Sequence, residues 1–223
     1  MRAHKGARQS PARVSEHWGV SADQVGNKFT VRANLRAARK QRDVTTLAEI
    51  DVRISRHIFD LLESIAVTAE SVIAAYVAMP FEPAINELRA HLRQLGSTVL
   101  IPIVSGDDLL WAADADEVSW SRNSFGTLEP AALGARTSSE ALSGCAAIIV
   151  PAQAVDASGF RLGQGKGFYD RALAEISGLE HSPLLIGVTY ESEFLPEVPT
   201  ETHDIPVDVS VTESTVRWFN TPD

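Results

Sequence analysis

Ala146-Ala-Ile-Ile-Val150 is an uninterrupted apolar run, and a polar loop separates it from Gly159-Phe-Arg-Leu-Gly-Gln-Gly-Lys-Gly-Phe-Tyr-Asp-Arg171. A short apolar run bounded by turn-forming residues is typical of a buried strand. A helix-like pattern follows the glycines, to about Ile176. A strand, a loop and a helix in this order form the repeating unit of parallel sheets. This stretch therefore predicts an α/β fold.

Strand-like and helix-like patterns alternate along the rest of the chain. They predict helices near residues 23–42, 46–65 and 83–95. They predict strands at residues 72–79, 99–104, 184–190 and 207–211, with shorter ones near 109–112, 117–120 and 216–219. Strands separated by helices imply parallel βαβ units and a sheet covered on both faces. We expect residues 23–223 to form a single three-layer, Rossmann-like α/β domain with a mainly parallel sheet and an N-terminal helical segment.

The composition is that of an ordinary globular protein. Hydrophobic residues make up 44% of the 223 residues and charged residues 22%. No stretch approaches the ~20 apolar residues needed to cross a bilayer, so we expect no membrane association. The single cysteine, Cys145, excludes an intrachain disulfide and a multi-cysteine zinc site, and it fits the reducing cytoplasm in which we expect the protein. Because Cys145 opens the apolar run, we expect a small core residue rather than a nucleophile.

Charge is distributed unevenly along the chain, whose formal net charge is −9. Residues 1–42 hold ten of the twenty Lys and Arg against two acids. The acidic remainder argues against nucleic-acid binding, which needs a basic surface. The basic N-terminal part must be solvated or face an anion. Residues 1–22 are expected to form a disordered extension, to which we assign no function.

Four basic residues of the first predicted helix share one face. Lys28, Arg32, Arg36 and Arg39 are spaced four, four and three residues apart, so they project within an arc of roughly 80°. Such a stripe is more often a solvated helix face than a binding surface. From the residues alone, both interpretations stay open.

The glycine-rich segment has the character of an anion-binding loop. Gly163, Gly165 and Gly167 allow close backbone approach and positive φ, so that amide N–H groups can face a phosphate. The start of the following helix adds partial positive charge. Lys166, the only lysine after residue 40, would neutralise phosphate, and Asp170 could hold Mg²⁺. The spacing fits neither a Walker A loop nor GxGxxG, and a flexible turn that caps a helix is the alternative.

Five segments together resemble the 5-formyltetrahydrofolate cyclo-ligase family. The glycine loop, preceded by Pro151-Ala-Gln-Ala-Val-Asp156, is similar to the family's signature. Four further segments follow the family's order, and they are Lys28-Phe-Thr-Val-Arg32, Met79-Pro-Phe-Glu82, Phe125-Gly-Thr-Leu-Glu-Pro130 and Thr202-His-Asp204-Ile-Pro206. The resemblance covers about residues 24–214. It departs from the family's usual pattern after Glu82, at Pro83-Ala-Ile85. In the loop, Gln164 and Lys166 stand where many relatives have tyrosine or glycine, although lysine also occurs in the family.

The resemblance implies an ATP- and Mg²⁺-dependent ligase. Its reaction converts 5-formyltetrahydrofolate, free or polyglutamylated, to 5,10-methenyltetrahydrofolate through a phosphorylated formyl (iminium phosphate) intermediate, with release of ADP and phosphate. By similarity, the nucleotide-binding residues are Lys28, Arg32, Arg161, Leu162, Gly163, Gln164, Gly165, Lys166, Gly167, Phe168 and Tyr169. The metal ligands would be Asp170 and Asp204, the folate contacts Met79, Glu82 and Tyr169, and the catalytic residues Lys166, Arg161 and Tyr169.

Some assignments stay open at this stage. Arg36 and Arg39 keep the solvated-face interpretation, although either could bind a polyglutamate tail. Tyr169 could equally be a packing residue. A monomer or a weak homo-oligomer is expected. The rival functions are a divergent relative with another ligand, a sugar-phosphate sensor or isomerase, and an adaptor whose arginine stripe binds a helix or RNA.

Overall fold

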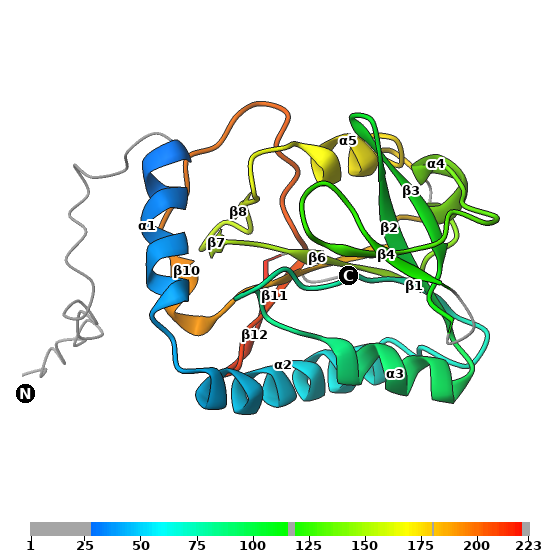
Figure 1. Cartoon of the computed structure of the whole chain (residues 1–223), viewed down its shortest axis with the longest axis horizontal. Helices are drawn as coiled ribbons and strands as arrows, with labels where there is room; N and C mark the ends of the chain where they lie inside the picture. The colour runs from blue at the N-terminus through cyan, green and yellow to red at the C-terminus, as the bar shows by residue number, and fades with distance from the viewer. Residues whose placement is uncertain (1–27, 116–118, 180, 220–223) are drawn as a thin grey trace, which may run out of the picture.

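A computed structural model describes residues 28–115, 119–179 and 181–219, which pack around one large sheet (Figure 1). Seven strands form it in the order β12-β11-β9-β6-β1-β2-β3. The parallel strands are β1 (Val72–Ala74), β2 (Thr98–Ser105), β6 (Ala147–Pro151), β9 (Leu184–Val188) and β11 (Val209–Val211). The edge strands, β3 (Asp108–Ala113) and β12 (Val216–Trp218), are antiparallel to their neighbours. The prediction of a mainly parallel sheet is confirmed.

Helices cover both faces of the sheet. In Figure 1, α2 (Val44–Ser64) and α3 (Asn86–Leu95) lie below it, and α4 (Ser138–Leu142) and α5 (Phe168–Ala174) lie above it. Burial on both faces explains why the sequence of β6 is an unbroken apolar run. Ile149 packs into the core between the sheet and helices α2 and α3. Ile148 and Val150 pack into the core between the sheet and helices α4 and α5. Cys145 belongs to the second core, where burial raises the pKa of its thiol to about 12, so it is a core residue.

Several predicted elements are shorter than their sequence patterns. Strand β1 ends at Ala74, not at Met79, because the chain leaves the sheet, and Tyr76, Val77, Met79 and Glu82 border a cleft. Helix α3 begins at Asn86 and ends at Leu95, and Gly96, with a left-handed φ of 98°, caps it. The first predicted helix, α1, spans Lys28–Lys40. The predicted extension 1–22 and the start of that helix lie outside the described residues.

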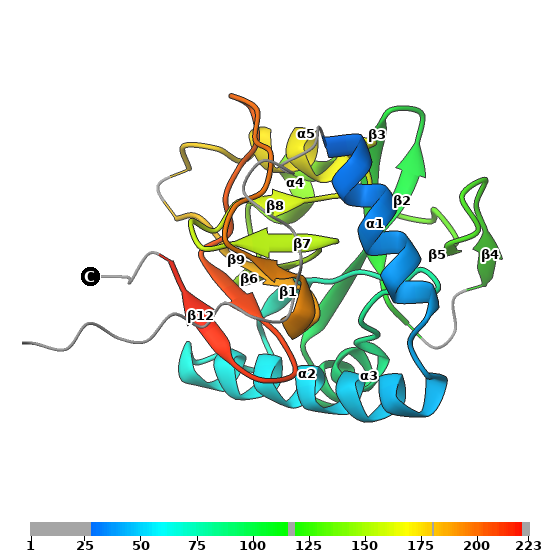
Figure 2. The ribbon, with the colours of Figure 1, turned by 90° about the vertical axis from the view of Figure 1, so that its left-hand side faces the viewer.

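The segment after β6, predicted as a loop, contains two short strands. These are β7 (Ala154–Asp156) and β8 (Arg161–Leu162), which join β10 (Phe194–Leu195) in a separate three-stranded sheet. Helix α1 packs on that sheet through Val31 and Leu35 (Figure 2). A second hairpin, β4 (Trp120–Arg122) with β5 (Leu128–Pro130), lies near β2. The small sheet therefore carries α1 beside the large one.

The order of the strands opens a crevice at the end of β1. The connection from β1 to β2 passes through α3 on one face, whereas α4 leads into β6 from the other face. In open α/β sheets, ligands bind beyond the carboxyl ends of strands at such a switch point. Among the described helices, none has the length and apolar character to cross a membrane.

Candidate active site

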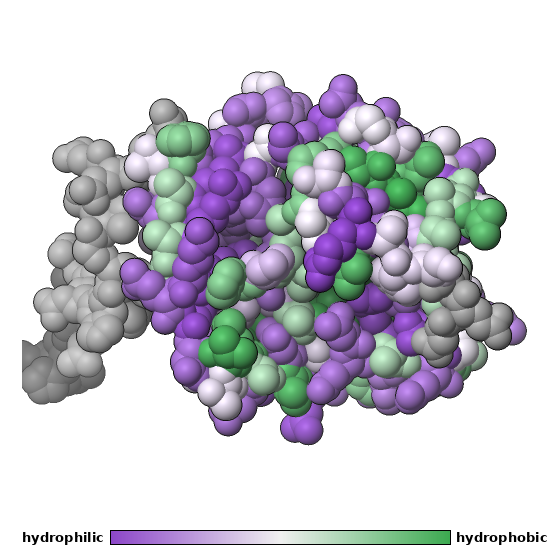
Figure 3. All heavy atoms as spheres, in the orientation of Figure 1, coloured by the Kyte–Doolittle hydropathy of each residue, from purple (hydrophilic) through white to green (hydrophobic). Residues whose placement is uncertain are grey.

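A cleft of about 850 Å³ lies at this switch point. Its walls come from α1, the segment after β1, the β4–β5 hairpin, the glycine loop and residues 201–204. Figure 3 shows hydrophilic side chains gathered where the surface is hollowed beside α1, with hydrophobic ones on the opposite side of the hollow. One end of the cleft is therefore suited to a charged group and the other to a flatter, less polar one.

All the residues that the sequence predicts for the site border this cleft. They come from both ends of the chain and from its middle: Lys28, Arg32, Met79, Glu82, Arg161, Leu162, Gly163, Gln164, Gly165, Lys166, Gly167, Phe168, Tyr169, Asp170 and Asp204. The fold brings these residues together, while their individual roles stay predictions.

Helix α1 lies directly over the glycine loop. Arg32 Nε donates to the carbonyl of Gly163 at 2.9 Å, and Arg36 Nη2 donates to the carbonyl of Gln164 at 3.0 Å. Gly165 has a φ of 95°, and a Cβ there would lie 3.2 Å from the guanidinium carbon of Arg32. A side chain at residue 165 would thus be strained and crowded. The basic face of α1 is a wall of the cleft at Lys28, Arg32 and Arg36.

Contrary to the prediction from the sequence, Arg39 does not lie on a solvated face of α1. Its side chain is buried, and its Nε and Nη2 donate to the two carboxylate oxygens of Glu193 at 2.9 and 2.7 Å. Burial lowers the pKa of Arg39, but the hydrogen bonds and charge of Glu193 outweigh it and raise the pKa. The expectation of a solvated or polyglutamate-binding Arg39 is therefore wrong. Arg36 stays exposed at the mouth of the cleft.

Each predicted metal ligand is paired with a cation. Asp204 Oδ2 accepts from Lys28 Nζ at 2.7 Å and from the backbone of Glu201 at 2.7 Å. Burial acts to raise the pKa of Asp204, but these hydrogen bonds lower it overall. Asp170 pairs with Arg161 Nη2 at 2.5 Å, and Arg161 is itself buried. Burial lowers the pKa of Arg161, against the opposing charges of Asp170 and Asp204.

The donor set suits a hard cation. Both carboxylates lie close enough to Arg161 to act on its charge, and carboxylate oxygens are the ligands that Mg²⁺ prefers. Within the described ranges, no group of three or more His, Cys, Asp or Glu side chains is arranged to hold a metal. Mg²⁺ commonly keeps several waters and shares phosphate oxygens, so two carboxylates fit such a site.

Lys166 lies at the hairpin side of the cleft. Its Nζ is 5.3 Å from the ring centroid of Phe125, and this ring also makes an edge contact with Phe168. Among the described residues, no carboxylate lies within ion-pair distance of Lys166. The ammonium therefore has an aromatic neighbour but keeps its charge available to an anion. Helix α5 has only seven residues, so the nearby basic side chains are the main source of positive charge.

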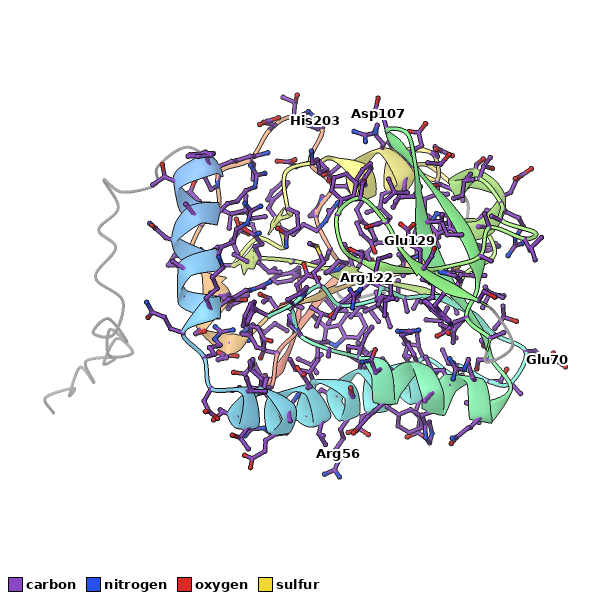
Figure 4. The ribbon with its side chains drawn as sticks, viewed as in Figure 1. Arg56, Glu70, Asp107, Arg122, Glu129 and His203 are labelled. Carbon is purple, nitrogen blue, oxygen red and sulfur yellow. The ribbon has the colours of Figure 1, made fainter. Side chains whose placement is uncertain are left out.

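The β4–β5 hairpin contributes residues to which the sequence gave no role. Glu129 is buried, and its Oε1 accepts from the backbone of Val104 at 2.8 Å and from Asn123 Nδ2 at 2.6 Å. Asn123 in turn accepts from the backbone of Phe125 at 2.9 Å. Glu129 is labelled in Figure 4. Glu129 lies in a segment that resembles the family, so its importance could have been predicted from the sequence. Its contacts could not.

The part of the cleft at Glu82 and Tyr169 is enclosed. Glu82 is 7% exposed, and its Oε2 accepts from the backbone of Met79 at 2.9 Å. Tyr76 donates to the carbonyl of Pro83 at 2.6 Å, which anchors the segment where the sequence departs from the family's pattern. The Tyr169 hydroxyl is buried without a hydrogen-bond partner among the described residues, and burial raises the pKa of that hydroxyl. A ligand could satisfy it.

Comparison with known proteins gives one consistent result. A model of the 5-formyltetrahydrofolate cyclo-ligase family matches residues 24–213. A 5-formyltetrahydrofolate cyclo-ligase from Mycolicibacterium smegmatis is 36% identical over 139 residues, covering 60% of this chain and 69% of the relative. The enzyme of that name from Haemophilus influenzae is 26% identical over 180 residues, covering 79% of this chain and 89% of the relative.

Solved structures agree on the fold. The 5,10-methenyltetrahydrofolate synthetase of Aquifex aeolicus superposes with a TM-score of 0.73, covering 88% of this chain and 94% of that one at 24% identity. The Mycoplasma pneumoniae synthetase superposes with a TM-score of 0.64, covering 83% and 98% at 17% identity.

Proposed function

The chain belongs to the 5-formyltetrahydrofolate cyclo-ligase family, a family of ligases, and from this premise we propose that it converts 5-formyltetrahydrofolate to 5,10-methenyltetrahydrofolate, with ATP and Mg²⁺. One observation carries the proposal. The basic face of α1 and the glycine loop line the same cleft as the buried carboxylate of Glu82, which accepts a hydrogen bond from the Gln164 side chain. A triphosphate and a pterin have the charges that these basic and acidic groups would recognise.

The nucleotide would bind between α1 and residues 161–169. Lys28, Arg32 and Lys166 supply cations for the phosphates, and the glycines at 165 and 167 allow the loop backbone to approach them. Lys28 is now neutralised by Asp204 and Arg161 by Asp170. A bound phosphate would compete for these cations and free the two carboxylates for a metal.

Asp170 and Asp204 would hold Mg²⁺. With a metal held there, these carboxylates would place positive charge beside the phosphates, where negative charge develops during phosphoryl transfer. Arg161 lies between these carboxylates and is held by the carbonyl of Ile205 as well as by Asp170. Its guanidinium would orient Asp170 and add positive charge beside the transferred group.

The folate would occupy the end of the cleft near Met79, Glu82 and Tyr169. Glu82 can accept hydrogen bonds from pterin N–H groups, because its carboxylate oxygens border the cleft. The unpartnered hydroxyl of Tyr169 would donate to the formyl group or to the pterin. Arg36, exposed at the mouth, is the residue that would reach a polyglutamate tail.

The chemical step needs activation of a poor leaving group. The formyl oxygen would attack the γ-phosphorus of ATP and release ADP, giving an iminium phosphate. N10 would then attack the formyl carbon and lose its proton, and the C–O bond would break to release phosphate. Phosphoryl transfer of this kind depends on positioning and charge stabilisation rather than on a protein nucleophile. Lys166, which has no carboxylate partner in the described part of the chain, would stabilise the transferred phosphoryl group.

Incubation of the purified protein with 5-formyltetrahydrofolate, Mg²⁺ and ATP tests the proposal. The chromophore of the methenyl product should appear, and ADP should form in equal amount. Product formation that continues undiminished when ATP is omitted would rule out the proposed reaction.

A further inference from the structure

We propose that Gln164 is a positioning residue that orients Glu82 and ties it to α1, so that the folate end of the cleft depends on a residue of the glycine loop. The inference rests on the function proposed above. It assigns the Gln164 side chain to Glu82, the carboxylate proposed to bind folate. The backbone of the same loop is still proposed to contact the nucleotide.

Three side chains fix the orientation of the Gln164 amide. Its Oε1 accepts from Arg36 Nη2 at 3.0 Å and from Gln153 Nε2. Its Nε2 donates to Glu82 Oε1 at 2.7 Å. With two donors directed at the amide oxygen, the NH₂ group must face the carboxylate. Gln153 is 1% exposed, so one of these donors is held rigidly by the core.

The hydrogen bond from Gln164 means that both carboxylate oxygens of Glu82 are held by the protein. Glu82 Oε2 is bound by the backbone of Met79, and Gln164 is the only side chain among the described residues that donates a hydrogen bond to Glu82. A buried carboxylate with an unsatisfied oxygen is costly and turns to find a donor. With both oxygens bound on the protein side, the remaining lone pairs face the cleft in a fixed direction.

A neutral amide suits this position in this chain. A lysine or arginine at residue 164 would pair with Glu82 and cancel the charge that attracts pterin N–H groups. A carboxylate would repel it. Other charged and titratable groups that act on Glu82 include Arg39 from α1, Tyr76 after β1 and Tyr169 from α5.

Steady-state kinetics of Gln164→Met separate positioning from a general structural role. Methionine keeps the length of the side chain but removes the donor and the acceptor. The KM for 5-formyltetrahydrofolate should rise roughly tenfold, the scale of one lost hydrogen bond to a charged group, while the KM for ATP should change less than about twofold. Gln94→Met, at an exposed residue of α3, is the matched control and should change neither value. Equal changes in both KM values, or no change, would overturn the inference.

Gln164→Glu gives a signature that packing alone would not produce. Two carboxylates at the present 2.7 Å separation cannot both ionise, so the pair takes up a proton with a raised pKa. The folate KM of this variant, relative to wild type, should therefore improve as the pH is lowered from about 8 to about 6. The folate KM of Gln164→Met, relative to wild type, should not change over this pH range. A pH-independent defect in Gln164→Glu would contradict the proposed contact.

A double-mutant cycle keeps the inference separate from the proposed function. Thermal unfolding of Gln164→Met, Glu82→Met and the double variant needs no substrate. The two shifts in Tm should be non-additive, because each change removes the same hydrogen bond, and additive shifts would overturn the contact. If wild type makes no methenyl product, the proposed function fails, and this cycle still decides whether Gln164 and Glu82 are coupled.

Discussion

Arg39 and Glu193, 154 residues apart in sequence, form a buried bidentate ion pair that fixes α1 to the short 3₁₀ helix η2 (Glu191–Glu193). Arg39 also donates to the carbonyl of Ala152 at 2.7 Å, and Glu193 accepts from Thr189 Oγ1 at 2.8 Å. The pair therefore joins the end of α1 to the segments that follow β6 and β9. Because α1 is rigid, this anchor also sets where Lys28 and Arg32 lie over the glycine loop.

Removal of one partner of this pair should strongly destabilise the fold. Arg39→Met would leave the Glu193 carboxylate buried with fewer donors, at a cost of about 3–5 kcal/mol in the free energy of unfolding. Urea denaturation measures this quantity. Arg56→Met is the matched control, because Arg56 is exposed and points away from the sheet in Figure 4. It should stay within about 0.5 kcal/mol of wild type, and a similarly small effect for Arg39→Met would contradict the anchoring role.

Asp51 should make stability depend on pH. Burial, together with the charge of Glu87, raises the pKa of Asp51 to about 6, despite its hydrogen bond from the backbone of Ala84. The unfolded value is about 3.9, so the folded state binds more protons between these values. Stability should fall as pH rises from about 4 to about 6 through this group. Asp51→Asn should therefore gain stability relative to wild type over that interval, with the exposed Asp60→Asn as control, and a constant difference would refute the shift.

Gly165 should be required for more than its backbone conformation. Gly165 and Gly178 have φ values of 95° and 84°, but only a Cβ at residue 165 would meet Arg32. Alanine at either position should cost about 1–3 kcal/mol of stability through backbone strain. Only Gly165→Ala should also raise the KM for ATP. If both variants bind ATP as wild type does, ATP binding does not depend on the close approach of residue 165 to Arg32.

Lys166 should act on the reaction and not on the fold. Lys166→Ala should lower kcat/KM by a factor that corresponds to about 2–4 kcal/mol of lost transition-state stabilisation, the scale of losing one preorganised charge. Lys166→Arg should recover only part, because a planar fork does not replace a compact ammonium beside the glycines. Thermal unfolding should change little, since the side chain is exposed. Lys40→Ala, which removes an exposed lysine outside the cleft, is the control; wild-type turnover in Lys166→Ala would show that the loop lysine has no part in phosphoryl transfer.

The parallel sheet could be predicted because buried strands need continuous apolar runs, as in residues 146–150. The end of β1 could not, because Tyr76, Val77 and Met79 are as apolar as strand residues but border the cleft instead. Strands β7 and β8 span three and two residues, too few for a periodic pattern. Sequence patterns are local, and such elements are fixed by packing.

The site shows the same division. Its residues could be predicted where they cluster in motifs, such as the glycine loop. The buried Arg39 looked like its solvated neighbours because its partner lies far along the chain, and no local rule connects residue 39 with residue 193. The Gln164–Glu82 contact was hidden for the same reason, since the two residues are 82 positions apart.

The fate of the formyl oxygen tests the central claim most directly. The protein would be given 5-formyltetrahydrofolate whose formyl oxygen is an isotopically heavy atom, together with ATP and Mg²⁺, and the released phosphate would be analysed by mass spectrometry. If the γ-phosphoryl group is transferred to the formyl oxygen, the heavy atom must leave in inorganic phosphate, one atom for each methenyl product. Methenyl product accompanied by unlabelled phosphate, with the heavy oxygen recovered in water, would contradict the phosphorylated intermediate and the role of the cleft in forming it.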